Sequence, residues 1–173
     1  MHSKRSLIFL ARWLGYAGAL PFLALGLLVL WPEFIGPELI GPEFIRLQIS
    51  SIMRFSEASI AFALLSYGAI ILSFLGGLHW GRAVTIPSDQ QIISMRTALL
   101  WSVSLSLIAW FALILQVMFL PMRYAASLLI AGFAAALIAD LKLLEKGYWP
   151  AWMRTLRLHL SLTAMASLLA LSI

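Results

Sequence analysis

The feature that most restricts the fold of this chain is a series of five apolar segments separated by more polar stretches. A helix of about 20 apolar residues crosses a hydrocarbon core about 30 Å thick. The segments that qualify lie at residues 10–31, 58–80, 97–119, 124–141 and 156–173. The last two are short, but charged side chains at their ends can extend toward the lipid headgroups. The sequence therefore predicts one integral-membrane domain over residues 1–173, an all-α bundle of five transmembrane helices.

Composition supports a membrane environment and excludes several functions. Of 173 residues, 62% are hydrophobic and 11% are charged, whereas roughly 25% are charged in an ordinary soluble domain. A soluble protein of this size exposes much of its surface to water, so the apolar excess is expected to face a lipid bilayer. The absence of cysteine excludes disulfides, thiolate metal sites and cysteine nucleophiles. The net charge of +5 comes from Lys and Arg scattered at the ends of apolar segments, so no nucleic-acid partner is expected.

The distribution of Lys and Arg predicts the orientation of the bundle. Basic residues are retained on the cytoplasmic side of a membrane. With five spans, nine of the twelve Lys and Arg residues lie on the same side as the amino terminus. The first span is too long for a signal peptide and has no small-residue cleavage site before Trp31, so a retained helix is expected. We therefore expect a multi-pass protein of a bacterial inner membrane, with the amino terminus cytoplasmic and the carboxyl terminus outside.

Small residues recur every four positions on several predicted helices, which lets helix backbones approach closely in lipid. On the second helix they are Ala69, Ser73, Gly77 and Gly81. On the fourth they are Ser127, Ala131, Ala135 and Ala139. These stripes predict a tight bundle that packs through the small residues. Trp110 lies in the middle of the third helix, where its indole N–H is expected to find a partner on a neighbouring helix.

The segment between the first two helices contains an internal repeat, PEFIGPELIGPEFI, at residues 32–45. The Gly-Pro junctions disfavour a regular helix. Glu33, Glu38 and Glu43 carry oxygens that could bind a cation, but one carboxylate every five residues on such a loop is a poor ligand set. We expect no metal site, and interpret the repeat as a loop whose Phe and Ile side chains dip into the headgroup region.

Chemistry is expected only from residues within the helices or at their ends. The segments outside the bilayer reach about 25 residues at most, too few for a catalytic domain. The sequence contains no Walker loop, no G-x-S-x-G elbow and no H-E-x-x-H helix. The predicted topology does bring four ionisable residues to similar depth near the cytoplasmic face: His79, Asp140, Arg157 and His159. Ionisable groups within a membrane are costly and often functional.

These four residues allow several uses. They could form a pocket for an anion or a lipid headgroup, a proton relay through His79 and Asp140, or an axial pair of His79 and His159 for haem. The simpler interpretation is that they anchor helix ends by pairing with one another or with lipid phosphates.

The run LSFLGGLHWG at residues 72–81 resembles the hallmark of a membrane family of unknown function. That family is found in bacterial inner membranes and includes mitochondrial transmembrane protein 69. Weaker matches follow at residues 132–133, 140, 150–152 and 156–157. The resemblance implies a multi-pass membrane protein without an established activity, and hence no catalytic residue. It marks these candidate functional residues: Ser73, Gly76, Gly77, His79, Trp80, Gly81, Asp140, Trp152 and Arg157.

The sequence thus predicts a non-enzymatic integral membrane protein that serves as an interaction or assembly factor. It would associate with another membrane protein or with a second copy of itself through the small-residue stripe of the second helix. A small proton-coupled transporter using His79 and Asp140 is the alternative, and a haem- or quinone-binding protein is a further one. No cofactor is expected under the first interpretation.

Overall fold

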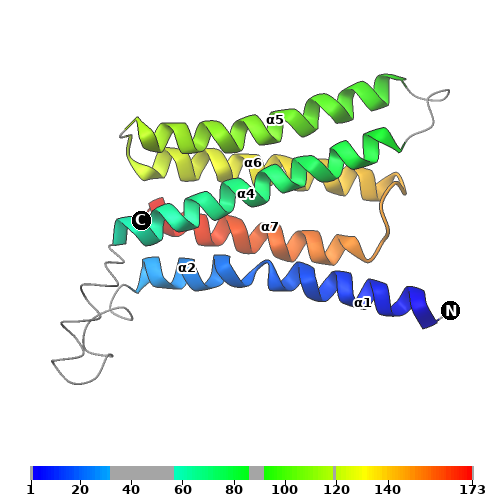
Figure 1. Cartoon of the computed structure of the whole chain (residues 1–173), viewed down its shortest axis with the longest axis horizontal. Helices are drawn as coiled ribbons and strands as arrows, with labels where there is room; N and C mark the ends of the chain where they lie inside the picture. Colours follow the sequence, from blue (N-terminus) through cyan, green and yellow to red (C-terminus); the bar gives the residue numbers. More distant parts are fainter. Residues whose placement is uncertain (1, 32–56, 86–91, 119, 173) are drawn as a thin grey trace.

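The computed structural model describes residues 2–31, 57–85, 92–118 and 120–172, which form helices and their connections with no strand among them. The helices are α1 (His2–Ala17), α2 (Leu20–Leu30), α4 (Glu57–Val84), α5 (Ile92–Val117), α6 (Met122–Glu145), α7 (Met153–Leu169) and the short 3-10 helix η3 (Ala170–Ser172). Figure 1 shows them packed side by side, with α1 and α2 following one another along one edge of the bundle.

The predicted all-α membrane bundle is confirmed. Within the described residues, five helical segments are long and apolar enough to cross a membrane: Arg5–Leu30, Ala58–Val84, Met95–Val117, Met122–Glu145 and Met153–Ser172. The two termini lie at opposite ends of the bundle in Figure 1, as an odd number of crossings requires. Which end faces the cytoplasm stays a prediction from the charge distribution. The PEFIG repeat lies outside the described residues.

The first span is broken where α1 ends and α2 begins. Pro21 is the second residue of α2 and has no N–H, so it cannot donate the hydrogen bond that would continue α1 into α2. The hydroxyl of Tyr67 on α4 donates a hydrogen bond of 2.8 Å to the carbonyl oxygen of Gly18 within the break. The kink expected at a transmembrane proline is therefore held by a neighbouring helix rather than left to water or lipid.

The centre of the bundle is built around α4, which packs against α5 and α6 at two close approaches. A Cβ atom added at Gly76 would lie 2.5 Å from the backbone oxygen of Ser102 on α5. One added at Gly132 on α6 would lie 2.6 Å from Cδ2 of Leu72. The hydroxyl of Ser73 adds a hydrogen bond of 3.1 Å to that of Ser106. Glycine and serine thus bring the helices together, as expected where lipid supplies no hydrophobic drive for association.

Two expectations about packing are wrong. On α6, Ser127 and Ala131 of the expected stripe are exposed, and the buried positions are Ala125, Ala126, Leu129, Gly132, Phe133, Ala136, Leu137 and Asp140. The face of α6 that is turned to the core carries Leu129 and Phe133 together with Gly132, which packs closely against Leu72. Trp110 is 59% exposed and points away from the bundle. An indole is amphipathic and apolar enough to lie against lipid chains.

Candidate functional site

A buried charge cluster joins three helices at one end of the bundle. His79 comes from the last turns of α4, Asp140 from the last turns of α6, and Arg157 from the second turn of α7. Their exposed fractions are 2%, 0% and 4%, so all three side chains are removed from both water and lipid. The sequence placed them at similar depth, and the structure brings them into contact. We call His79, Asp140 and Arg157 the charge cluster.

The short connection between α6 and α7 places Asp140 and Arg157 opposite each other. Gly147 in this connection has a φ of 73°, a left-handed conformation that glycine adopts without the steric cost of a Cβ atom. Pro150 follows and cannot continue a helix from α6, so the chain reverses before α7 begins at Met153. The reversal makes α6 and α7 antiparallel neighbours, and residues near the end of one helix face residues near the start of the other.

Both oxygens of the Asp140 carboxylate are engaged. Oδ2 accepts a hydrogen bond of 2.6 Å from Nε of Arg157 and also pairs with Nη2 of the same guanidinium. Oδ1 lies 3.0 Å from Nε2 of His79. Nε2 of His79 and Oδ1 of Asp140 are at ion-pairing distance, but they do not form an aligned hydrogen bond. Neither atom has a hydrogen-bond partner among the described residues. The guanidinium balances the carboxylate charge, and such pairing is what makes a buried ion tolerable.

Aromatic side chains lie over the charge cluster at the end of the bundle. The ring centroid of Trp149 is 5.7 Å from that of His79, with the planes tilted by 38°. Beside it, the guanidinium carbon of Arg82 lies 5.2 Å from the centre of the Tyr148 ring, a cation–π arrangement. Tyr148 and Trp149 both belong to the connection between α6 and α7. Their contacts with His79 and Arg82 follow from the α6–α7 connection and have no signal of their own in the sequence.

The remaining candidate residues do not gather at the charge cluster. Ser73 and Gly76 lie at the contact with α5, and Trp152 is half-buried at the start of α7. Three others on α4 face outward, since Trp80 is 49% exposed and Gly77 and Gly81 are exposed. No described atom lies within 4 Å of a Cβ built on Gly77 or Gly81. The stripe on α4 is therefore divided, with Ala69 and Ser73 used within the chain and the two glycines presented to its surroundings.

His159 does not join His79. It is exposed on α7, and its Nδ1 lies 3.1 Å from the hydroxyl of Tyr16 on α1. His79, in contrast, points its Nε2 at the Asp140 carboxylate. An axial pair needs two imidazoles that face one cavity, so this geometry gives no support to haem ligation by these two residues.

The helices and the buried ion pair define a class, that of multi-pass α-helical membrane proteins with a buried ion pair at one end of the bundle. The chain belongs to the family described as "Protein of unknown function (DUF3429)", which matches residues 8–173. It is similar to transmembrane protein 69 of Xenopus tropicalis, with 40% identity over 109 residues, or 63% of this chain and 40% of that protein. Transmembrane protein 69 of Mus musculus is 32% identical over 110 residues, or 62% of this chain and 41% of that protein.

The chain thus spans about two fifths of the length of these relatives. No solved structure matches it.

Proposed function

We propose that this protein is a non-enzymatic interaction or assembly factor of a bacterial inner membrane, and that α4 offers a docking face to a transmembrane helix of another chain. The observation that carries the proposal is the outward position of Gly77 and Gly81. These residues are spaced as G-x-x-x-G, the pattern that lets two helix backbones cross closely in lipid. Within the described part of the chain, nothing fills the space in front of them.

The charge cluster supports this proposal by holding the docking face in place. His79 lies between Gly77 and Gly81 in the sequence but points inward, where Asp140 lies 3.0 Å from it. Asp140 is in turn bound to Arg157 on α7. The contact opposes rotation of α4 about its axis, and it keeps the two glycines turned outward. A rigid, preorganised face loses less conformational entropy on association than a mobile one.

Replacing Gly77 by Leu is expected to abolish association while the chain still inserts and folds. The leucine side chain would separate the two backbones at the crossing point, whereas within the chain it enters open space. We expect at least about tenfold weaker association, equivalent to about 1.4 kcal/mol. The measurement is native co-purification of a tagged chain from membranes, together with cross-linking of the purified protein to detect a second copy.

Ile138→Leu is the control for a leucine on an exposed face of another helix, because Ile138 is an exposed apolar residue on α6. Association that is unchanged by Gly77→Leu, in the pull-down and in the cross-linking, would remove the docking face from consideration.

Proton-coupled transport is a second candidate, favoured by the buried contact between His79 and Asp140. Imidazole readily exchanges a proton near neutral pH, and ionisable pairs inside membranes form proton relays. The expected result is that wild-type protein in liposomes dissipates an imposed pH gradient, followed with an entrapped pH-sensitive dye, and that His79→Ala does not. Equal rates for wild type, variant and empty liposomes would exclude this role.

A further inference from the structure

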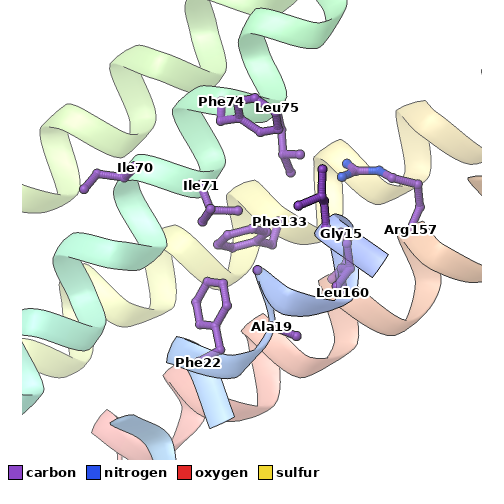
Figure 2. A pocket seen from close by; sticks show the side chains of 13 residues that line it. Gly15, Ala19, Phe22, Ile70, Ile71, Phe74, Leu75, Phe133, Arg157 and Leu160 are labelled. Carbon is purple, nitrogen blue, oxygen red and sulfur yellow. The ribbon is translucent and has the colours of Figure 1, made fainter. Parts of the chain in front are cut away.

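A cavity of about 320 Å³ lies between the first span and α4, and its inner wall is formed by α6 and α7. Its size is at the lower end of the range for small-molecule pockets, about 300–1,000 Å³. Figure 2 shows Phe22, Ile71 and Phe133 around this space, with the Arg157 side chain at one end. Leu14 and Ile70 at its edge are 64% and 63% exposed, so the cavity opens sideways toward lipid rather than toward water.

The cavity lies beside the break in the first span. The lining residues around the break are small: Gly15, Gly18 and Ala19. The hydrogen bond from Tyr67 to the Gly18 oxygen keeps the break at this position. The cavity therefore lies beside a break whose position is held by a neighbouring helix.

The polar end of the cavity carries an unused hydrogen-bond donor. Ser161 on α7 lines the cavity and is 2% exposed, and its hydroxyl has no hydrogen-bond partner in the part of the chain that the structure describes. A buried hydroxyl without a partner is costly, and a ligand in the cavity that accepted a hydrogen bond from it would remove that cost. Arg157 lines the same end, and its charge is balanced by Asp140. This end of the cavity thus offers donors without net charge, which favours a neutral carbonyl oxygen over a phosphate or carboxylate.

The depth of this end narrows the class of ligand. Ser161 lies about 12 Å along α7 from its start at Met153, counting 1.5 Å per residue. In a helix that begins at the membrane interface, this position is inside the hydrocarbon core, beyond the region occupied by lipid headgroups. The ester carbonyls of a phospholipid stay at the interface. A carbonyl compound that is itself soluble in the hydrocarbon core can reach the hydroxyl.

We propose that this cavity binds the ring of a membrane-soluble quinone. A carbonyl oxygen of the ring accepts from the Ser161 hydroxyl, the ring packs against the apolar side chains of the wall, and the isoprenoid chain leaves through the opening toward lipid. A flat, neutral ring with acceptors and no donors matches a wall that supplies donors and apolar surface. The proposal concerns binding alone and is independent of the docking face on α4.

Equilibrium dialysis of the full-length protein in detergent micelles tests the proposal, with a benzoquinone carrying two isoprene units as the probe. We expect saturable binding at about one quinone per chain. Ser161→Ala is expected to weaken binding about tenfold, because it removes the hydroxyl that holds the carbonyl. Ile71→Trp places an indole in the cavity and should abolish binding. Ser167→Ala is the matched control, because Ser167 is a buried serine on the same helix that does not line the cavity.

Circular dichroism and size-exclusion chromatography identify variants that retain the fold, and Ser161→Ala is mild enough to test the proposal if Ile71→Trp does not fold. Three results would overturn it. One is uptake that does not saturate or that is equal in Ser161→Ala and wild type. Another is unchanged uptake by folded Ile71→Trp. The third is phospholipid that co-purifies with wild type, is lost in Ile71→Trp and is not displaced by the quinone, which would assign the cavity to an acyl chain.

Discussion

Replacement of Asp140 by Ala is expected to lower the free energy of unfolding by about 3–5 kcal/mol. The carboxylate is completely buried and is the counter-ion of Arg157, which is itself 4% exposed. Its removal leaves a guanidinium charge in a low-dielectric site that neither water nor lipid headgroups reach. His79 cannot compensate, because imidazole is neutral or positive. The measurement is unfolding by SDS titration in mixed micelles, followed by the combined fluorescence of the seven tryptophans, of which Trp149 lies next to His79.

A double variant separates the cost of an unpaired charge from a general loss of packing. Asp140→Leu combined with Arg157→Met removes both charges and keeps apolar volume. We expect its stability to lie within about 1 kcal/mol of wild type, because a buried ion pair contributes little net stability over well-packed apolar residues. A double variant as unstable as Asp140→Ala would show that the cluster stabilises the fold by its shape or hydrogen bonds rather than by charge balance.

Two adjacent glycines are expected to differ in how strongly the same substitution destabilises the chain. Gly76→Ala places a methyl group 2.5 Å from the backbone oxygen of Ser102, and a backbone atom cannot rotate away as a side chain can. The two helices must separate, which is expected to cost about 1–3 kcal/mol. Gly77→Ala adds the same methyl group where no described atom lies within 4 Å. Its effect on the stability of the isolated chain is expected to stay within about 0.5 kcal/mol.

The same SDS titration, performed on both variants in parallel, measures the difference. Because the two positions are neighbours in one helix, the changes in helix propensity are the same, and the difference between them reports the contact with α5 alone. Equal destabilisation by both substitutions would contradict the division of α4 into an inward-facing and an outward-facing glycine.

The depth of a residue along its helix could be predicted from the sequence. His79, Asp140 and Arg157 were placed at one depth because each lies near the same end of its predicted helix. The face that each helix turns toward its neighbours could not be predicted. The stripe that includes Ser127 and Ala131 was predicted to pack against a neighbouring helix. Those two residues are exposed, and Gly132 makes the close contact with Leu72 instead. Trp110 was assigned to a helix contact and is exposed.

The cavity beside α7 could not be predicted from the sequence for the same reason. Pro21 lies at the break in the first span, but the sequence did not show that Tyr67 would hold the break or that Ser161 would line the space beside it. These residues come from three separate helices. Their meeting depends on the crossing geometry of the helices.

By itself, the sequence determined that the chain is a five-span helical membrane protein and which ionisable residues lie near one end of it. Insertion into lipid depends on the apolar length of each segment, a property that each segment carries independently. Only the tertiary structure decided that Asp140 binds Arg157 and approaches His79, and that Gly76 faces α5 while Gly77 faces outward. Lipid solvates all apolar faces of a helix almost equally, so the rotation of each helix is set by contacts with its neighbours, which no single segment encodes.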